Sequence, residues 1–254
     1  MIPVEICIEA SEPAAVTQAT SAAYHGGATT VELCAAMDLD GLTPSTDCLT
    51  AARQAFGQRP GLMVMIRPHA GDFDYTPDEL TLMAAQIDAA ARGGADGVVF
   101  GVLSAADGRI DSDANRRLLA AARERGLKAT FHRAFDATPD PDAALDTLLE
   151  LGFDRGLTSG LPWGRQGTAL DGAAQLARTI LRAGDRIEVV VGGGISPANV
   201  GPLLARLPLH AGRVSVHAYS GAKIGGRTTL EAVRTLVAAA GAEASRSRKH
   251  AGAE

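Results

Sequence analysis

The fold is decided by residues 4–34, VEICIEASEPAAVTQATSAAYHGGATTVELC, which carry the pattern of a strand, a helix and a second strand. Apolar residues at every second position predict strands over Val4–Ile8 and Thr30–Cys34. Between them, Ser11-Glu12-Pro13 indicates the start of a helix, and Gly26-Gly27 indicates its end. The segment therefore predicts one β–α–β unit with parallel strands.

The same pattern continues along the whole chain. Helix starts are indicated by a capping box at Thr76-Pro77-Asp78-Glu79, by Asp140-Pro141 and by Ser196-Pro197. Six further strands are predicted, each beginning roughly one βα unit after the last: Leu62–Arg67, Gly97–Val102, Lys128–His132, Arg155–Thr158, Ile187–Val191 and Arg213–His217.

Eight strands in alternation with helices predict a parallel sheet. The even number of strands and their regular spacing favour a single (β/α)8 TIM-type barrel over an open doubly wound sheet. We expect the barrel domain to cover residues 1–241. The Ala-, Ser- and Gly-rich residues 242–254 are predicted to form a disordered C-terminal tail.

Composition excludes several classes of protein. Hydrophobic residues make up 46% of the 254 residues, which is enough for a large core, and the net charge of −5 leaves no basic face for nucleic acid. No apolar run approaches the length of a membrane span, and the N-terminus has no signal-peptide pattern. The three cysteines form no disulfide framework, so a cytoplasmic protein is expected.

Polar residues are predicted inside the barrel. Since alternate strand residues face opposite sides and the apolar ones pack on the helices, the polar ones point inward. This predicts a cluster from five strands that is a candidate catalytic site: Glu5, Glu32, Arg67, His132 and His217. Such residues are costly to bury unless they pair or bind a ligand. The alternative interpretation is a structural ion network in which Arg67 bridges two carboxylates.

Polar loops follow the predicted strands, at the end where barrel enzymes carry their active sites. We expect these loops to contribute ligand-binding or supporting residues: Asp72, Arg133, Asp136, Thr158, Ser159, Gly193, Gly194 and Ser220. The run Gly192-Gly193-Gly194 and the loop after the last strand are where barrels often bind phosphate. The alternative for the glycine run is a simple tight turn.

The order and spacing of several motifs resemble the CutC copper homeostasis family. The resemblance rests on Val4-Glu5-Ile6-Cys7, Val31-Glu32-Leu33-Cys34-Ala35-Ala36, Gly41-Leu42-Thr43-Pro44-Ser45, Ile66-Arg67-Pro68 with Gly71-Asp72-Phe73, Phe131-His132-Arg133-Ala134-Phe135-Asp136, Leu157-Thr158-Ser159-Gly160 and Val216-His217. It implies a TIM-type barrel, a cytoplasmic location, homo-oligomers and a role in copper homeostasis. The chain departs from the family at Ile8, where relatives often carry a second cysteine, at His69-Ala70 and at Ala218-Tyr219.

One predicted function is copper binding. Cys7 and Cys34 occupy equivalent places on neighbouring strands about 4.8 Å apart, so their sulfurs could share one soft Cu(I) ion. His132 or His217 could add a nitrogen ligand. The alternative is that both cysteines are inert core residues. Met63 and Met65 are expected to face different sides and to belong to the core, and Cys48 is expected to pack in a helix.

The other predicted function is an enzyme that acts on a small phosphorylated or sugar-like substrate. In this interpretation Glu5 or Glu32 is a base, His132 an acid or base, and Arg67 a clamp for an oxyanion or carboxylate. A hard metal ion held by Glu32, His132 and His217 is a third hypothesis.

Overall fold

Eight parallel strands close into a barrel in the computed structural model, which describes residues 2–251 and the side chains of residues 2–242. The strands follow one another in chain order, and the first pairs with the last, so that Glu5 lies opposite both Thr30 and His217. This confirms the TIM-type barrel and excludes the open sheet. The strands are β1 Val4–Glu9, β2 Thr30–Cys34, β3 Leu62–Met65, β4 Gly97–Phe100, β5 Lys128–Phe131, β6 Arg155–Thr158, β7 Glu188–Val191 and β8 Arg213–Ala218.

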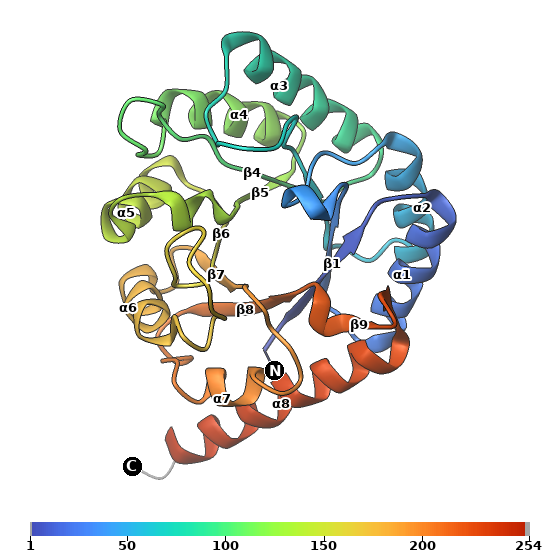
Figure 1. Cartoon of the computed structure of the whole chain (residues 1–254), viewed down its shortest axis with the longest axis vertical. Coiled ribbons are helices and arrows are strands. Elements are labelled where there is room, and N and C mark those ends of the chain that lie inside the picture. Colours follow the sequence, from blue (N-terminus) through green and yellow to red (C-terminus); the bar gives the residue numbers. More distant parts are fainter. Residues whose placement is uncertain (1, 252–254) are drawn as a thin grey trace.

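A ring of helices surrounds the barrel (Figure 1). These are α1 Pro13–Gly26, α2 Thr46–Phe56, α3 Pro77–Arg92, α4 Ser112–Glu124, α5 Pro141–Leu151, α6 Ala173–Ala183, α7 Val200–Leu204 and α8 Leu230–Ala251. Short 3-10 helices η1 Met37–Leu39, η2 Arg133–Ala137 and η3 Ser220–Ala222 follow three of the strands, and β9 Lys223–Ile224 pairs with β10 Arg227–Thr228 as a small hairpin.

The predicted helix starts hold at three of four positions, and α1 begins at Pro13 as expected. Thr76 and Glu79 form the expected capping box, and the Asp140 side chain caps α5. The fourth prediction, a helix start at Ser196-Pro197, was wrong, because Ser196 does not cap a helix. Instead its amide donates to the Asn199 side chain at 2.8 Å, and the five-residue α7 begins only at Val200.

The main hydrophobic core lies between the barrel and the helices. Outward-facing strand residues such as Ile6, Val64 and Phe131 are fully or almost fully buried there, and each such side chain contributes about 1.5–3 kcal/mol. Close packing extends to the helix ring, where a Cβ atom on Gly26 of α1 would lie 2.4 Å from the Val233 side chain of α8. The apolar side chains of each strand therefore pack in this outer core, and the side chains on the opposite face point into the barrel.

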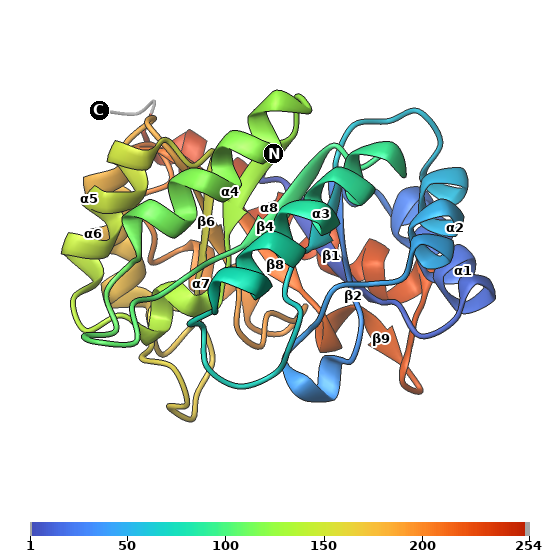
Figure 2. The ribbon, with the colours of Figure 1, turned by 90° about the horizontal axis from the view of Figure 1, so that it is seen from above.

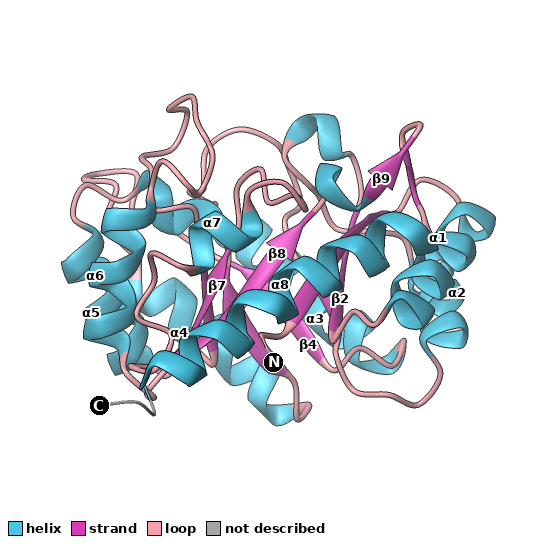
Figure 3. Ribbon diagram, turned by 90° about the horizontal axis from the view of Figure 1, so that it is seen from below, coloured by secondary structure: helices cyan, strands magenta, loops and turns pink. Residues whose placement is uncertain are grey.

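The two ends of the barrel differ. The chain begins at one end, and the β9–β10 hairpin protrudes from the other (Figures 2 and 3). At the hairpin end, β3 and β5 are shorter than predicted, so Arg67 and His132 lie just beyond their strands. The Arg67 amide donates to the Thr43 hydroxyl at 2.8 Å, and Pro68 follows it. These residues therefore sit in the mouth.

Helix α8 continues through Ala251, past Gly241, where the sequence predicts the tail to begin. Residues 252–254 of that predicted tail lie outside the described residues. Within the described part of the chain, no helix is both long and apolar enough to cross a membrane.

Candidate functional site

A buried ion network forms the floor of the site. One carboxylate oxygen of Glu5 accepts hydrogen bonds from Arg155 Nη1 at 2.7 Å and from the Thr30 hydroxyl at 2.9 Å. The other faces His217 Nδ1 at 3.1 Å, and Arg155 Nε lies 3.3 Å from Glu188. An ion network was one prediction from the sequence, but Arg155 supplies its guanidinium.

The charges of this floor are set by mutual pairing. Burial opposes ionisation of Glu5, but Arg155 and His217 hold its pKa well below the ordinary value. Burial likewise disfavours the imidazolium of His217, yet Glu32, Cys7 and Glu5 raise its pKa well above the ordinary value. At neutral pH we therefore expect a carboxylate on Glu5 and an imidazolium on His217.

Glu32 lies beside this network but is less well partnered. Its Oε2 is 3.4 Å from His217 Nδ1, and its Oε1 is buried without a hydrogen-bond partner among the described residues. Burial raises the pKa of Glu32 to about 8. The residue is therefore mostly a neutral acid at pH 7.

Arg67 does not bridge carboxylates, and that prediction was wrong. Its Nη1 donates to the carbonyl oxygens of Leu39 at 2.8 Å and Gly41 at 3.1 Å, and its Nη2 donates to Gly71 O at 2.9 Å. Because Arg67 lies beyond the end of β3, its side chain meets loop carbonyls instead of the strand carboxylates. It ties the loop after β2 to the loop after β3.

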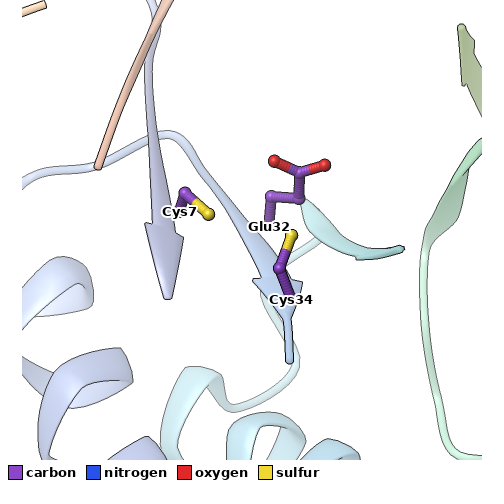
Figure 4. A group of neighbouring side chains, drawn as sticks. All are labelled: Cys7, Glu32 and Cys34. Carbon is purple, nitrogen blue, oxygen red and sulfur yellow. The ribbon is translucent and has the colours of Figure 1, made fainter. Parts of the chain in front are cut away.

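Three sulfur atoms gather above the floor. The sulfurs of Cys7 and Cys34 and one carboxylate oxygen of Glu32 lie within 4.8 Å of one another. Figure 4 shows the Cys7 sulfur pointing toward the strand that carries Glu32 and Cys34. The thioether of Met37 is 3.8 Å from the Cys7 sulfur. The predicted neighbourhood of the two cysteines is present, with an added thioether that the sequence analysis missed.

Two further methionines share this environment. Met63 and Met65 cluster with Cys7, Cys34 and Val99 inside the barrel. The expectation that the two methionines face different sides was wrong, because residues two apart on a strand share a face. Cys48, in contrast, packs in the outer core as expected.

The two cysteines differ in acidity. A hydrogen bond from Cys34, aided by His217 and opposed by burial, lowers the pKa of the Cys7 thiol to about 6. The same hydrogen bond and burial raise the pKa of Cys34 well above its ordinary value. Cys7 is therefore available as a thiolate at neutral pH, while Cys34 keeps its proton.

A cavity of about 270 Å³ opens above these residues. One side, the sulfur half, consists of Cys7, Glu32, Cys34, Met37 and His217. The other side, the arginine half, consists of Arg67, Phe73, His132, Arg133 and Trp163. The rest of the lining is formed by Asp40, Met65, Leu157, Gly193, Gly194, Tyr219 and Ser220. The cavity thus contains four of the five predicted cluster residues, while Glu5 lies beneath it.

His132 is held as a neutral ring. Its Nδ1 accepts a hydrogen bond from the Ala134 amide at 3.2 Å, which leaves the proton on Nε2. Burial and the nearby Arg67 lower the pKa of His132 to about 3. The Nε2–H is buried and has no partner among the described residues. His132 therefore offers an Nε2–H donor that no acceptor among the described residues satisfies.

The predicted loop residues form a support beneath Arg133. The buried carboxylate of Asp136 accepts hydrogen bonds from Arg133 Nε at 2.8 Å, the Ser159 hydroxyl at 2.9 Å and the Thr158 hydroxyl. The Arg133 guanidinium lies over the Trp163 ring, 5.1 Å from its centre. Only Arg133 and Trp163 of this group reach the cavity.

The other predicted ligand residues divide into two groups. Gly193, Gly194 and Ser220 line the cavity. Both glycines have positive φ angles, and a Cβ on Gly193 would lie 2.7 Å from Ser159, so the tight turn there requires glycine. Asp72 is exposed and lies outside the cavity lining, whereas its neighbour Phe73 is buried and forms part of it.

The sequence analysis also missed Arg155, whose place on the inner face follows from the structure. Arg155 and Leu157 are two apart on β6, and Leu157 lines the cavity, so the period of two places Arg155 on the inner face. Met37 had no comparable signal. It lies in a turn between Ala36 and Asp40, non-glycine residues with positive φ angles of 46° and 64°.

Comparisons with known proteins agree with this architecture. The sequence model of the CutC family matches residues 2–222. A human protein named copper homeostasis protein cutC homolog is 43% identical over 200 residues, which cover 79% of this chain and 68% of the human one. A CutC family protein of Vibrio vulnificus strain YJ016 is 37% identical over 235 residues, covering 92% and 85% of the two chains.

Solved structures show the same similarity. The putative copper homeostasis protein CutC of Streptococcus agalactiae superposes with a TM-score of 0.75 at 29% identity, covering 90% of this chain and all of that one. A 2-keto-3-deoxy-6-phosphogluconate aldolase of Zymomonas mobilis has a TM-score of 0.54 at 15% identity, covering 96% and 93% of the two chains. The aldolase shares the fold alone.

Proposed function

Because the chain belongs to the CutC family, we propose that it serves copper homeostasis by binding Cu(I) at Cys7 and Cys34. The observation that carries this proposal is the cluster of two thiols and the Met37 thioether in the sulfur half of the cavity. Thiolate and thioether sulfurs are the ligands that Cu(I) prefers among protein groups. Two buried thiols and a half-buried thioether from separate parts of the chain fit this ion.

The surroundings also support binding of a cation through thiolates. The hydrogen bond and charge of His217 favour the thiolate of Cys7. Cys34 would release its proton to the solvent when it binds the ion. The apolar side chains of Met63, Met65 and Val99 pack around the pair and limit the access of water. These residues suit a soft ion better than a hydrated hard one.

We further propose that the protein acts in the cytoplasm. All three cysteines are buried and free, and a reducing compartment preserves thiols in that state. Homo-oligomers, implied by the family resemblance, stay a prediction that light scattering would test.

The test is an anaerobic Cu(I) titration against a competing chelator. Loss of even outer-shell partners weakens metal sites by about 10- to 100-fold, so we expect the Cys7→Ser/Cys34→Ser variant to lose more than about 100-fold in affinity. Cys48→Ser is the matched control, since this buried cysteine lies in the outer core. One-to-one binding that is equal in the wild type and the double variant would contradict the proposal.

A further inference from the structure

The arginine half of the cavity is built differently from the sulfur half. Phe73 connects its members, with ring-centre distances of 5.1 Å to His132 and 5.2 Å to Trp163, and with Arg67 Cζ 5.2 Å from its own ring centre. The wall is thus an aromatic surface with polar N–H groups at its edge. None of the sulfur donors belongs to it.

Arg67 carries a buried charge that the fold leaves unbalanced. The residue is 2% exposed, and its three hydrogen bonds go to uncharged carbonyl oxygens. Within the described part of the chain it forms no ion pair with a carboxylate, and its Nε–H has no hydrogen-bond partner; the buried Tyr75 hydroxyl lies near its guanidinium but is also uncharged. Asp40 also lines the cavity but is exposed at its rim. A buried cation without a counterion is costly, so an anion is the missing partner.

The second open group points to the same kind of ligand. His132 is 3% exposed and offers Nε2–H as a donor with no acceptor among the described residues. Its Nδ1 is already occupied by the Ala134 amide, so the ring cannot turn its donor elsewhere without losing that bond. Arg67 and His132 therefore each keep one N–H without an acceptor, and both residues line one cavity.

We propose that the arginine half binds a small organic carboxylate, with its oxygens accepting from Arg67 and from His132 Nε2–H. The single unbalanced charge of Arg67 matches a monoanion. Arg133, the other arginine of the arginine half, is already paired with Asp136 at 2.8 Å. Phe73, Trp163 and Leu157 offer apolar surface to a carbon skeleton, which inorganic phosphate lacks. The site uses no sulfur ligand, so this inference stands apart from copper binding.

Trp163 is the single tryptophan of the chain and belongs to the arginine half. Its fluorescence therefore reports directly on ligand binding in the arginine half. We would titrate the full-length protein with isobutyrate and with isobutyramide, which has the same shape but no charge, and separately with inorganic phosphate. We expect isobutyrate to bind about tenfold or more tightly than isobutyramide, since hydrogen bonds to charged groups are the stronger ones. Phosphate is expected to bind more weakly than isobutyrate.

Two variants locate the ligand. Arg67→Met removes the charge, and His132→Asn keeps an acceptor for the Ala134 amide while removing the Nε2–H. Each is expected to weaken isobutyrate binding by about tenfold, and Arg117→Met, an exposed arginine of α4, is the control that should bind as the wild type does. If Arg67→Met does not fold, His132→Asn and Arg67→Lys decide the question.

The proposal is overturned if the acid and its amide bind equally, or if folded His132→Asn retains wild-type affinity. Tighter binding of phosphate than of isobutyrate would equally overturn the assignment to carboxylates. A Cu(I) titration of the same His132→Asn sample separates this result from copper binding, because its sulfur ligands are intact.

Discussion

The floor beneath the cavity and the arginine half of the cavity use buried polar groups in opposite ways. Below the sulfur half, Glu5, Arg155 and His217 satisfy one another through ion pairs of 2.7 and 3.1 Å. In the arginine half, Arg67 and His132 are fixed by backbone groups and leave one donor each without an acceptor. The difference teaches that burial alone does not identify a ligand site, because paired charges can be structural. Buried hydrogen-bond donors without an acceptor, on rigidly held side chains, are a more specific sign of a ligand site.

The largest expected effect comes from breaking the paired floor. Arg155→Met leaves the Glu5 carboxylate buried without its guanidinium, which is expected to lower the free energy of unfolding by about 3–5 kcal/mol. Urea denaturation measures it. The double variant Glu5→Gln/Arg155→Met is expected to recover part of the loss, because it removes the orphaned charge. A loss below about 1 kcal/mol in the single variant would show that the floor is not the structural element described here.

A second prediction concerns the neutral ring of the arginine half. Since the pKa of His132 falls from 6.5 to about 3 on folding, the unfolded chain binds more protons below pH 6.5, and the stability supplied by neutral His132 is lost as the pH falls. Between pH 6.5 and 5 this amounts to about 2 kcal/mol. Glu32, with its raised pKa, acts in the opposite direction over this range.

The measurement is therefore the difference in unfolding free energy between the wild type and His132→Asn at the two pH values. The stability advantage of the wild type is expected to be larger at pH 6.5 than at pH 5. His217 stays protonated in the folded protein across this window, so proton uptake by the unfolded chain adds only a small slope of the opposite sign, which cancels in the difference between the two proteins. An advantage that does not change with pH would mean that the pKa of His132 is not lowered on folding.

The smallest expected effect sharpens the definition of the sulfur half. Met37→Leu removes the thioether beside Cys7 with little change in volume, and is expected to weaken Cu(I) binding by about tenfold, or about 1.4 kcal/mol. Met83→Leu, in the outer core, is the matched control. The competition titration with the chelator measures both. Equal affinities in the two variants would restrict the site to the cysteines.

The sequence predicted the barrel and most of its inner face for a clear reason. Apolar alternation in strands such as Val4–Glu9 assigns each side chain to a face, and the spacing of βα units assigns the topology. The partners of the site residues were harder to predict from the sequence. Arg155 lies on a strand whose outer face includes Gly156, so the apolar signal that marks its neighbours is missing there. Met37 depends on left-handed turn residues that are not glycine, which no local pattern indicates.

Arg67 also links the arginine half of the cavity to the sulfur half. The carbonyl groups of Leu39 and Gly41, which it holds, belong to the same turn that carries Met37 against Cys7. A ligand in the arginine half that binds the Arg67 guanidinium therefore affects the turn that positions the Met37 thioether. Thermodynamic linkage then requires reciprocity: whatever factor a carboxylate applies to the affinity for copper, copper applies to the affinity for the carboxylate.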